Sequence, residues 1–172
     1  MDTKALFAVL LVAGIAGGFV VNAYLVDNNA KQIEVTNKAP DFTLTDTEGN
    51  EFNLSDYEGE KVIVLEFMNM KCGTCKNFEK DAMKSYCNES MPEDVEVISV
   101  TQTKNADESK LIERSNEMGW KFMKGSSEMT DAFGADRSPT VVIIDKEGMI
   151  TFSESGTMSK SELEEKINEA LE

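Results

Sequence analysis

The chain has 172 residues, which leaves room for one domain besides a terminal segment. It carries 32 acidic against 17 basic side chains, for a net charge of −15. This acidity argues against nucleic acid and anionic lipid headgroups as partners, because both are themselves negatively charged. Histidine is absent and the cysteines number three, which excludes Ser-His-Asp triads, Cys-His catalysis, histidine metal sites and a framework that pairs every cysteine.

The first predicted element is a membrane-spanning helix over residues 5–26, which are uncharged and nearly all apolar. At about 1.5 Å per residue, this stretch is long enough to cross a hydrocarbon core of about 30 Å. Lys4 flanks its start and Asp27 its end, so the positive-inside rule places residues 1–4 in the cytoplasm and the remainder outside it. The alternative is a signal peptide cleaved near Val21-Asn22-Ala23, which would release a secreted protein. Either way, we expect the domain to be exported.

A short polar linker over residues 27–38 leads to the expected domain, residues 39–172. The domain begins with a stretch over 39–45 in which apolar and polar residues alternate, as they do in a strand. Glu48-Gly49-Asn50 is a turn signal, and residues 51–54 supply the return strand. The domain therefore opens with a predicted β-hairpin.

An almost continuously apolar run over residues 62–68 predicts a central strand that is covered on both faces. Cys72 and Cys75 follow, and a helical pattern continues from Cys75 to about Asn88. The free N–H groups and the macrodipole at a helix N-terminus favour a thiolate on Cys72. The i, i+3 spacing brings the two sulfurs within reach of a disulfide. Such a dithiol can pass two electrons to and from the disulfide of another protein.

A second central strand is predicted over residues 95–100, followed by a helix over 107–118. Leu111, Ile112 and Met118 form the expected buried side of that helix.

Two apolar runs, residues 141–144 and 149–152, flank the turn at 145–148 and predict a second hairpin. The tail is a predicted helix that starts with a capping box at Ser159 and repeats apolar residues at Leu163, Ile167 and Leu171. The order of hairpin, βαβ unit, helix, hairpin and helix predicts an α/β fold with a mixed sheet and helices on both faces.

This order and five short motifs resemble the thioredoxin superfamily, in its membrane-tethered TlpA/ResA-like branch related to the AhpC/TSA group. In the order of that family, the motifs are Ala39-Pro-Asp-Phe-Thr-Leu, Gly49-Asn-Glu-Phe-Asn-Leu-Ser, Leu65-Glu-Phe-Met, Cys72-Gly-Thr-Cys and Ser138-Pro-Thr-Val-Val-Ile-Ile-Asp-Lys-Glu-Gly. The resemblance covers about residue 38 to the end of the chain. It implies a thioredoxin fold with an N-terminal hairpin extension after one transmembrane helix. It also implies an extracytoplasmic thiol:disulfide oxidoreductase with Cys72 as nucleophile and Cys75 as resolving thiol.

The same resemblance implies roles for three further residues. Pro139 matches the cis-proline of the family, which positions a substrate strand, and Ser138 then helps to shape the substrate groove. The alternative for Pro139 is an ordinary trans proline at the start of a strand. Glu66 lies six residues before Cys72, where thioredoxins place a buried acid that can take a proton from Cys75. The alternative for Glu66 is an edge glutamate that reaches water.

Three residues around the cysteines are expected to contact the substrate, and two of them depart from the family pattern. Lys71 stands where the family usually has tryptophan, and its charge should favour a thiolate on Cys72, unless it is simply a solvated loop lysine. Thr74 replaces the proline of the common CGPC motif, and Gly73 precedes it. Because the residues between the cysteines tune the reduction potential, these departures leave the direction of electron flow open, with a reductant favoured.

The partners implied by the resemblance are exported cysteine-containing proteins, apocytochromes among them, and a membrane-embedded thiol reductant or oxidant. No cofactor or metal is expected, since the two cysteines are themselves the redox centre. Cys87 lies about 18 Å along a continuous helix from Cys75, too far for a disulfide, and is interpreted as a small buried hydrophobe.

Several alternatives to the oxidoreductase interpretation stay open. A structural zinc site would need two more ligands than the two cysteines supply. An AhpC/TSA-type peroxidase would need a Pro-x-x-x-Thr/Ser-x-x-Cys setting, which the sequence lacks. A chaperone for a soft ion such as Cu(I) and a non-catalytic thioredoxin-like interaction module are the other two candidates.

Overall fold

The structure is a computed structural model that describes residues 38–172 of the chain. The expected cytoplasmic start (1–4), membrane anchor (5–26) and all but the last residue of the linker (27–38) lie outside the described residues. Between Lys38 and Glu172, no helix has the length and apolar character needed to span a membrane.

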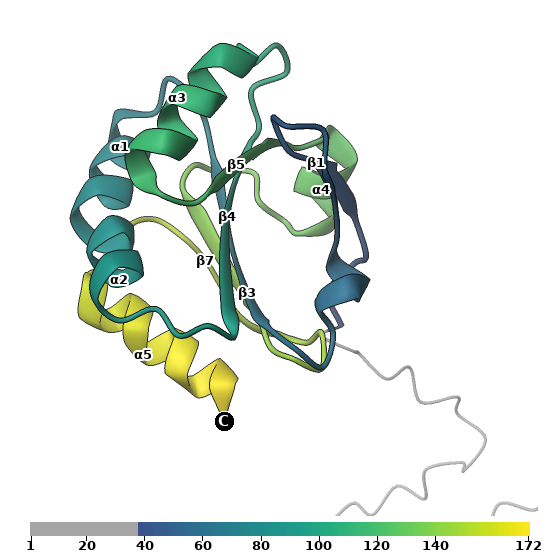
Figure 1. Cartoon of the computed structure of the whole chain (residues 1–172), viewed down its shortest axis with the longest axis vertical. Coiled ribbons are helices and arrows are strands. Elements are labelled where there is room, and N and C mark those ends of the chain that lie inside the picture. Colours follow the sequence, from purple (N-terminus) through teal and green to yellow (C-terminus); the bar gives the residue numbers. More distant parts are fainter. Residues whose placement is uncertain (1–37) are drawn as a thin grey trace, which may run out of the picture. The chain divides into compact units, whose positions relative to one another are not determined.

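A mixed five-stranded β-sheet forms the centre of the domain (Figure 1). Its strands are β3 (Val62–Met68), β4 (Val95–Thr101), β5 (Lys121–Lys124), β6 (Thr140–Ile144) and β7 (Ile150–Ser155). Their order is β5-β4-β3-β6-β7, in which β3, β4 and β5 run parallel and β6 runs antiparallel to β3 and β7. A separate antiparallel hairpin pairs β1 (Thr43–Thr45) with β2 (Glu51–Asn53). Both predicted hairpins and the predicted βαβ unit are confirmed.

Strand β3 is the middle strand of the sheet, and all seven of its residues are buried. Side chains alternate between the two faces of a strand, so the even-numbered residues of β3 face one layer and the odd-numbered residues the other. Val62, Val64 and Met68 belong to one core, while Ile63 and Leu65 belong to the other. The apolar run of the sequence thus reflects burial on both faces.

Helices cover the face that carries the even-numbered residues of β3. They are α1 (Gly73–Phe78), a π-helical turn η2 (Glu79–Met83), α2 (Lys84–Glu89), α3 (Glu108–Met118) and α5 (Lys160–Leu171). The opposite face is covered by the β1–β2 hairpin, a 3₁₀ turn η1 (Leu54–Tyr57) and α4 (Ser127–Ala132). Figure 1 shows the two layers on either side of the sheet.

Some local predictions need correction. The helix expected from Cys75 begins at Gly73 and contains the π turn η2 in its middle. Strand β5 and helix α4 were not predicted as elements. Ile112 was expected in the core but is 41% exposed, because the buried stripe of α3 runs through Leu111, Arg114 and Met118. The charged residue Arg114 therefore lies in the core, where the apolar pattern predicted Ile112.

Candidate active site

Cys72 and Cys75 form a disulfide at the end of the sheet where β3 stops and α1 begins, with Cα atoms 5.3 Å apart. Cys72 caps the helix, and its Sγ accepts a hydrogen bond of 3.0 Å from the backbone N–H of Cys75. Cys72 is partly exposed, whereas Cys75 is fully buried; Gly73 and Thr74 between them are exposed. A partner thiol or disulfide can therefore reach the sulfur of Cys72 but not that of Cys75.

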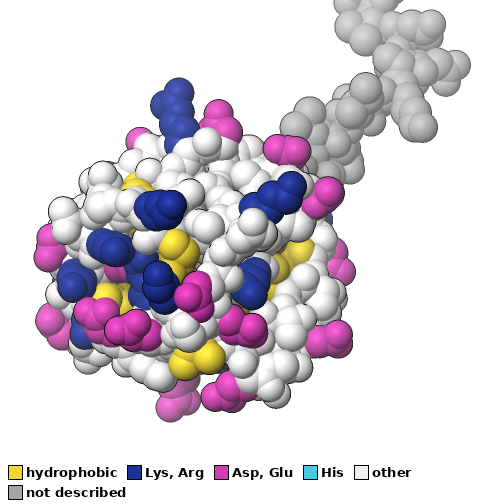
Figure 2. All heavy atoms as spheres, turned by 90° about the horizontal axis from the view of Figure 1, so that it is seen from above, with side chains coloured by type: hydrophobic (Ala, Val, Ile, Leu, Met, Phe, Trp, Pro, Cys, Tyr) yellow, Lys and Arg dark blue, Asp and Glu magenta, His cyan; other side chains and the backbone are white. Residues whose placement is uncertain are grey.

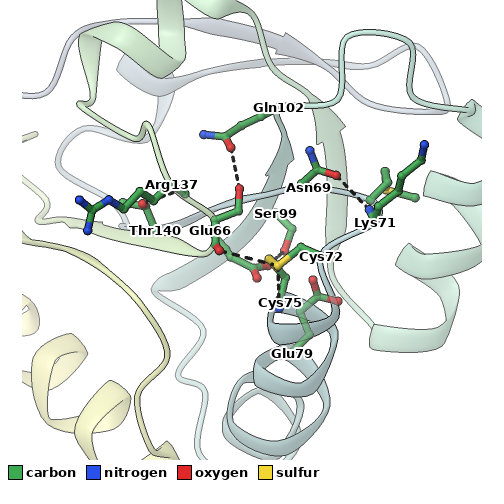
Figure 3. The surroundings of a disulfide bond; sticks show 12 residues. Glu66, Asn69, Lys71, Cys72, Cys75, Glu79, Ser99, Gln102, Arg137 and Thr140 are labelled. Carbon is green, nitrogen blue, oxygen red and sulfur yellow. Dashed lines mark hydrogen bonds between the residues drawn. A yellow bond between two sulfur atoms is a disulfide. The ribbon is translucent and has the colours of Figure 1, made fainter.

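The loop that carries Cys72 is held by Asn69 and by the segment that follows β4. The N–H groups of Lys71 and Cys72 donate to the side-chain and backbone oxygens of Asn69, at 3.0 and 2.9 Å. The N–H of Met70 donates to Thr103 Oγ1, at 3.2 Å, just beyond the end of β4. The side chain of Lys71 is exposed and points away from the disulfide (Figure 3). Within the described residues, the Lys71 side chain makes no hydrogen bond to Cys72, and an effect of its charge on the Cys72 thiolate stays a prediction.

Exposed cations also flank the neighbouring strands at this end of the sheet. Lys104 comes after β4 and Arg137 before β6. Figure 2, which looks down on the top of Figure 1, shows several Lys and Arg side chains grouped together, with acidic side chains around them. Several cations thus lie together on this face of a chain whose net charge is −15.

The Ser138–Pro139 peptide bond is cis and lies against the disulfide. The carbonyl oxygen of Ser138 is 3.7 Å from Cys72 Sγ. Ser138 Oγ donates a hydrogen bond of 2.6 Å to Gln102 Oε1, and Gln102 Nε2 donates to the carbonyl of Ala135. Gln102 thereby holds both ends of the loop before β6. Sequence reasoning missed Gln102, although its place directly after a central strand was a signal.

Glu66 is completely buried and faces the helical layer, because it belongs to the even-numbered residues of β3. It lies beside Ser99 in the parallel register, and Ser99 Oγ donates to Glu66 Oε2 at 2.5 Å. Burial, followed by the nearby charge of Glu79, raises the pKa of the Glu66 carboxyl well above its usual range. Burial therefore favours the neutral, protonated form of the Glu66 carboxyl in the folded protein.

A second buried acid, Glu79, was missed by the sequence reasoning. It lies in the π turn η2, is completely buried, and accepts two hydrogen bonds from Arg114 of α3, at 2.7 and 2.5 Å. Burial raises the pKa of the Glu79 carboxyl, and the Arg114 guanidinium opposes this by stabilising the carboxylate. Figure 3 shows the side chains of Glu66 and Glu79 on the inner side of the disulfide.

Cys87 is a free thiol in α2 and is partly buried. Burial raises the pKa of this thiol to about 11, so it stays protonated at neutral pH. In the part of the chain that the structure describes, the third cysteine is thus a protonated thiol apart from the disulfide-bonded pair.

Comparison with known proteins gives a consistent result. The family model described as Redoxin matches residues 34–171. The thiol-disulfide oxidoreductase ResA of Geobacillus kaustophilus is 33% identical over 167 residues, which cover 91% of this chain and 89% of the relative.

Two solved structures share the fold. The exposed lipoprotein thioredoxin Etrx1 of Streptococcus pneumoniae has a TM-score of 0.63 at 24% identity and covers 76% of this chain and 99% of its own. StoA of Bacillus subtilis has a TM-score of 0.61 at 18% identity, with 74% and 96% covered. The chain belongs to the Redoxin family and, within the thioredoxin superfamily, to the TlpA/ResA-like thiol-disulfide oxidoreductases.

Proposed function

We propose that this protein works outside the cytoplasm as a reductant, which opens disulfides in exported cysteine-containing proteins, including apocytochromes. The observation that carries the proposal is the pairing of an accessible Cys72 with a buried Cys75 at a helix start, beside a buried carboxyl. The resemblance to ResA, a thiol-disulfide oxidoreductase, supports the reaction type. The uncharged stretch at residues 5–26 supports a membrane anchor and an extracytoplasmic domain.

In the proposed reaction, the Cys72 thiolate attacks a client disulfide and forms a mixed disulfide, and the first client sulfur leaves as a thiolate. Cys75 then attacks Cys72 Sγ while its proton passes to Glu66. The Cys72–Cys75 bond forms, the mixed disulfide breaks and the second client sulfur leaves as a thiolate. Two electrons have moved from this protein to the client. A membrane-embedded thiol reductant reverses these steps and restores the dithiol, so no cofactor or metal is needed.

The surroundings of Cys72 suit a substrate strand. Pro139 matches the cis-proline of the family, which lies against the disulfide and leaves a backbone group free to pair with an extended client segment. Ser138, held by Gln102, forms one side of the proposed groove. Lys71, Gly73 and Thr74 are exposed on the other side and complete the contact surface.

The reduction potential of the Cys72–Cys75 pair tests this function. The purified full-length chain is equilibrated against glutathione and dithiothreitol series, and the fraction of disulfide is measured. We expect a value near about −270 mV, as in thioredoxin, which makes the protein a reductant. A value near about −120 mV would make it an oxidant and contradict the proposed direction.

Two variants serve as controls for that measurement. Cys72→Ser should abolish exchange with a client disulfide, whereas Cys87→Ser should leave the potential unchanged because Cys87 is a separate free thiol. Failure of the wild-type chain to cycle between dithiol and disulfide would refute the redox function. Retention of copper after purification would then favour the chaperone for a soft ion.

A further inference from the structure

A cluster of buried polar groups lies behind the disulfide, which we call the carboxyl cluster: Glu66, Glu79, Ser99, Arg114 and Trp120. Every member is at most 7% exposed. The members come from β3, η2, β4, α3 and the segment before β5, so the fold brings five separate parts of the chain together here. Buried charges are costly unless they are paired, so such a cluster needs a physical reason to persist.

Hydrogen bonds satisfy most of the cluster. Arg114 donates through Nε and Nη2 to both oxygens of Glu79, at 2.7 and 2.5 Å, in a bidentate pair. Its guanidinium carbon also lies 5.5 Å from the centre of the Phe122 ring. Trp120 Nε1 donates to Ser99 Oγ at 2.9 Å, which leaves the hydroxyl hydrogen of Ser99 for Glu66 Oε2. Both carboxylate oxygens of Glu79 are therefore held by a cation.

One oxygen remains without a donor. Glu66 Oε1 is buried and no donor of the described residues reaches it. A hydrogen bond between the Glu66 and Glu79 carboxyls becomes possible once Glu66 carries a proton. A proton on Glu66 Oε1 therefore satisfies the unpartnered oxygen and gives the Arg114-bound carboxylate of Glu79 a further donor.

We propose that Glu79 and Arg114 are positioning residues of the dithiol reaction: the carboxylate of Glu79, held in place by Arg114, keeps a proton on Glu66 Oε1 in the oxidised protein. This inference rests on the proposed function and adds to it the groups that control the proton. Charged groups face Glu66 from two neighbouring elements, as Glu79 of η2 and Arg114 of α3, and Cys75 adjoins from α1. Lys76 acts on Glu79 from the same helical segment. The residues of β6 and α5 that join this core are all apolar: Val141, Ile143, Leu163, Ile167 and Ala170.

The proton has a defined place in the step that opens the disulfide. A thiolate of the reductant attacks Cys72 Sγ and forms a mixed disulfide, and the Cys72–Cys75 bond breaks. The electron pair of that bond leaves on Cys75, which takes the proton from Glu66 and becomes a thiol. Glu66 is left as a carboxylate, and the charge of Arg114 then stabilises two acids. When Cys75 later attacks a mixed disulfide, its proton returns to Glu66.

The test compares two variants that change the charge beside Glu66 in opposite directions. Glu79→Gln removes the negative charge beside Glu66 and leaves that of Arg114, so Glu66 should lose its proton at lower pH. Arg114→Met removes the positive charge, so Glu66 should keep its proton to higher pH. The readout is the rate of disulfide reduction by dithiothreitol, divided by the fraction of dithiothreitol present as thiolate. We expect the pH midpoint of this rate to move by about 1–3 units, down in Glu79→Gln and up in Arg114→Met.

Two further variants serve as controls for this measurement. Glu66→Gln should lower the normalised rate by roughly 100-fold and remove its pH dependence, since general acid catalysis typically contributes at least that factor. Lys166→Met, which breaks the surface pair of Lys166 with Glu169, should leave the midpoint unchanged. Midpoints that move in the same direction in Glu79→Gln and Arg114→Met, or that do not move, would overturn the inference.

An infrared measurement keeps the test decisive if a single variant does not fold. The oxidised wild-type chain should show the C=O band of a protonated carboxyl at neutral pH, and Glu66→Gln should lack it. The double variant Glu79→Gln/Arg114→Met leaves no unpaired buried charge and should keep the band at a shifted frequency, because Glu66 then faces an amide. An unshifted band, or no band in the wild type, would contradict the inference. Disulfide exchange by the wild type in that case leaves the proposed function standing.

Discussion

A carboxyl in the middle of a fully buried strand is stable as a neutral acid far more readily than as an anion. Glu66 is such a group, and Figure 3 shows it close to the disulfide. Arg114 is the reverse case, a cation that remains charged in the core because Glu79 neutralises it through two hydrogen bonds. Glu66 should therefore make the free energy of unfolding depend on pH, which can be measured.

The pH dependence of stability should report the proton on Glu66. The folded chain keeps this proton above the ordinary pKa of 4.5, at which the unfolded chain loses it. The free energy of unfolding should therefore fall by about 1.4 kcal/mol per pH unit from this group, until pH passes the raised folded pKa. Glu66→Gln cannot ionise, so this slope should vanish in urea denaturation over the same pH range. Glu51→Gln, at an exposed position, should keep the slope of the wild type.

The sequence predicted the residues near the disulfide better than those that support them. Cys72, Cys75, Glu66 and Pro139 could be found because each has a fixed place relative to a motif or a strand. Glu79 and Arg114 could not, because they are 35 positions apart in the chain and each looks like an ordinary helical surface residue. Only the packing of α3 against η2 shows that they meet.

At the scale of elements, α3 shows how one buried charge alters a helical pattern. The sequence predicted Leu111, Ile112 and Met118 as its buried side. In the structure, Arg114 takes the place expected for Ile112. An α-helix has 3.6 residues per turn, so a buried stripe through positions 111, 114 and 118 leaves position 112 at the edge of that stripe.

Two substitutions in α3 should separate the core from its flank. Leu111→Ala should lower the free energy of unfolding by about 2–5 kcal/mol, because Leu111 is buried against the helical core. Ile112→Ala should cost far less, since Ile112 is 41% exposed. Urea denaturation of the two variants measures both values. Equal losses would mean that α3 is rotated relative to the structure described here.

The elements that sequence analysis overlooked are the short ones. Strand β5 has four residues and α4 has six, so neither shows a full period of apolar repetition. Strand β5 forms because β4 offers it a parallel edge with paired residues from Ile98 to Thr101. Its existence therefore depends on a neighbour that is distant in sequence.

At the scale of the whole domain, the sheet separates two apolar cores with different tasks. The helical core contains Cys75 and packs against the buried face of Glu66. The other core is closed by the β1–β2 hairpin and α4 through residues such as Phe52 and Phe133. We infer that both cores contribute stability, and that the redox chemistry belongs to the first.

A core substitution on the hairpin tests this division. Phe52→Ala should lower the free energy of unfolding by about 3–5 kcal/mol, because Phe52 is 2% exposed and lies in the second core. The reduction potential of the Cys72–Cys75 pair should stay the same. Glu51→Ala, its exposed neighbour, should change neither quantity. A shifted potential in Phe52→Ala would mean that the two cores are coupled through the sheet.

The place where the described chain begins has a consequence for access to the dithiol. Lys38 pairs with Met149, its Nζ donates to Glu147 O at 2.8 Å, and Ala39 N–H donates to Gly148 O at the same distance. This turn joins β6 to β7 at the end of the sheet opposite to Cys72. The seven residues of β3 separate the two ends by about 23 Å. If the domain were immobilised on a solid surface through residue 38, Cys72 would therefore lie at the opposite end of the sheet and stay accessible to a large folded partner.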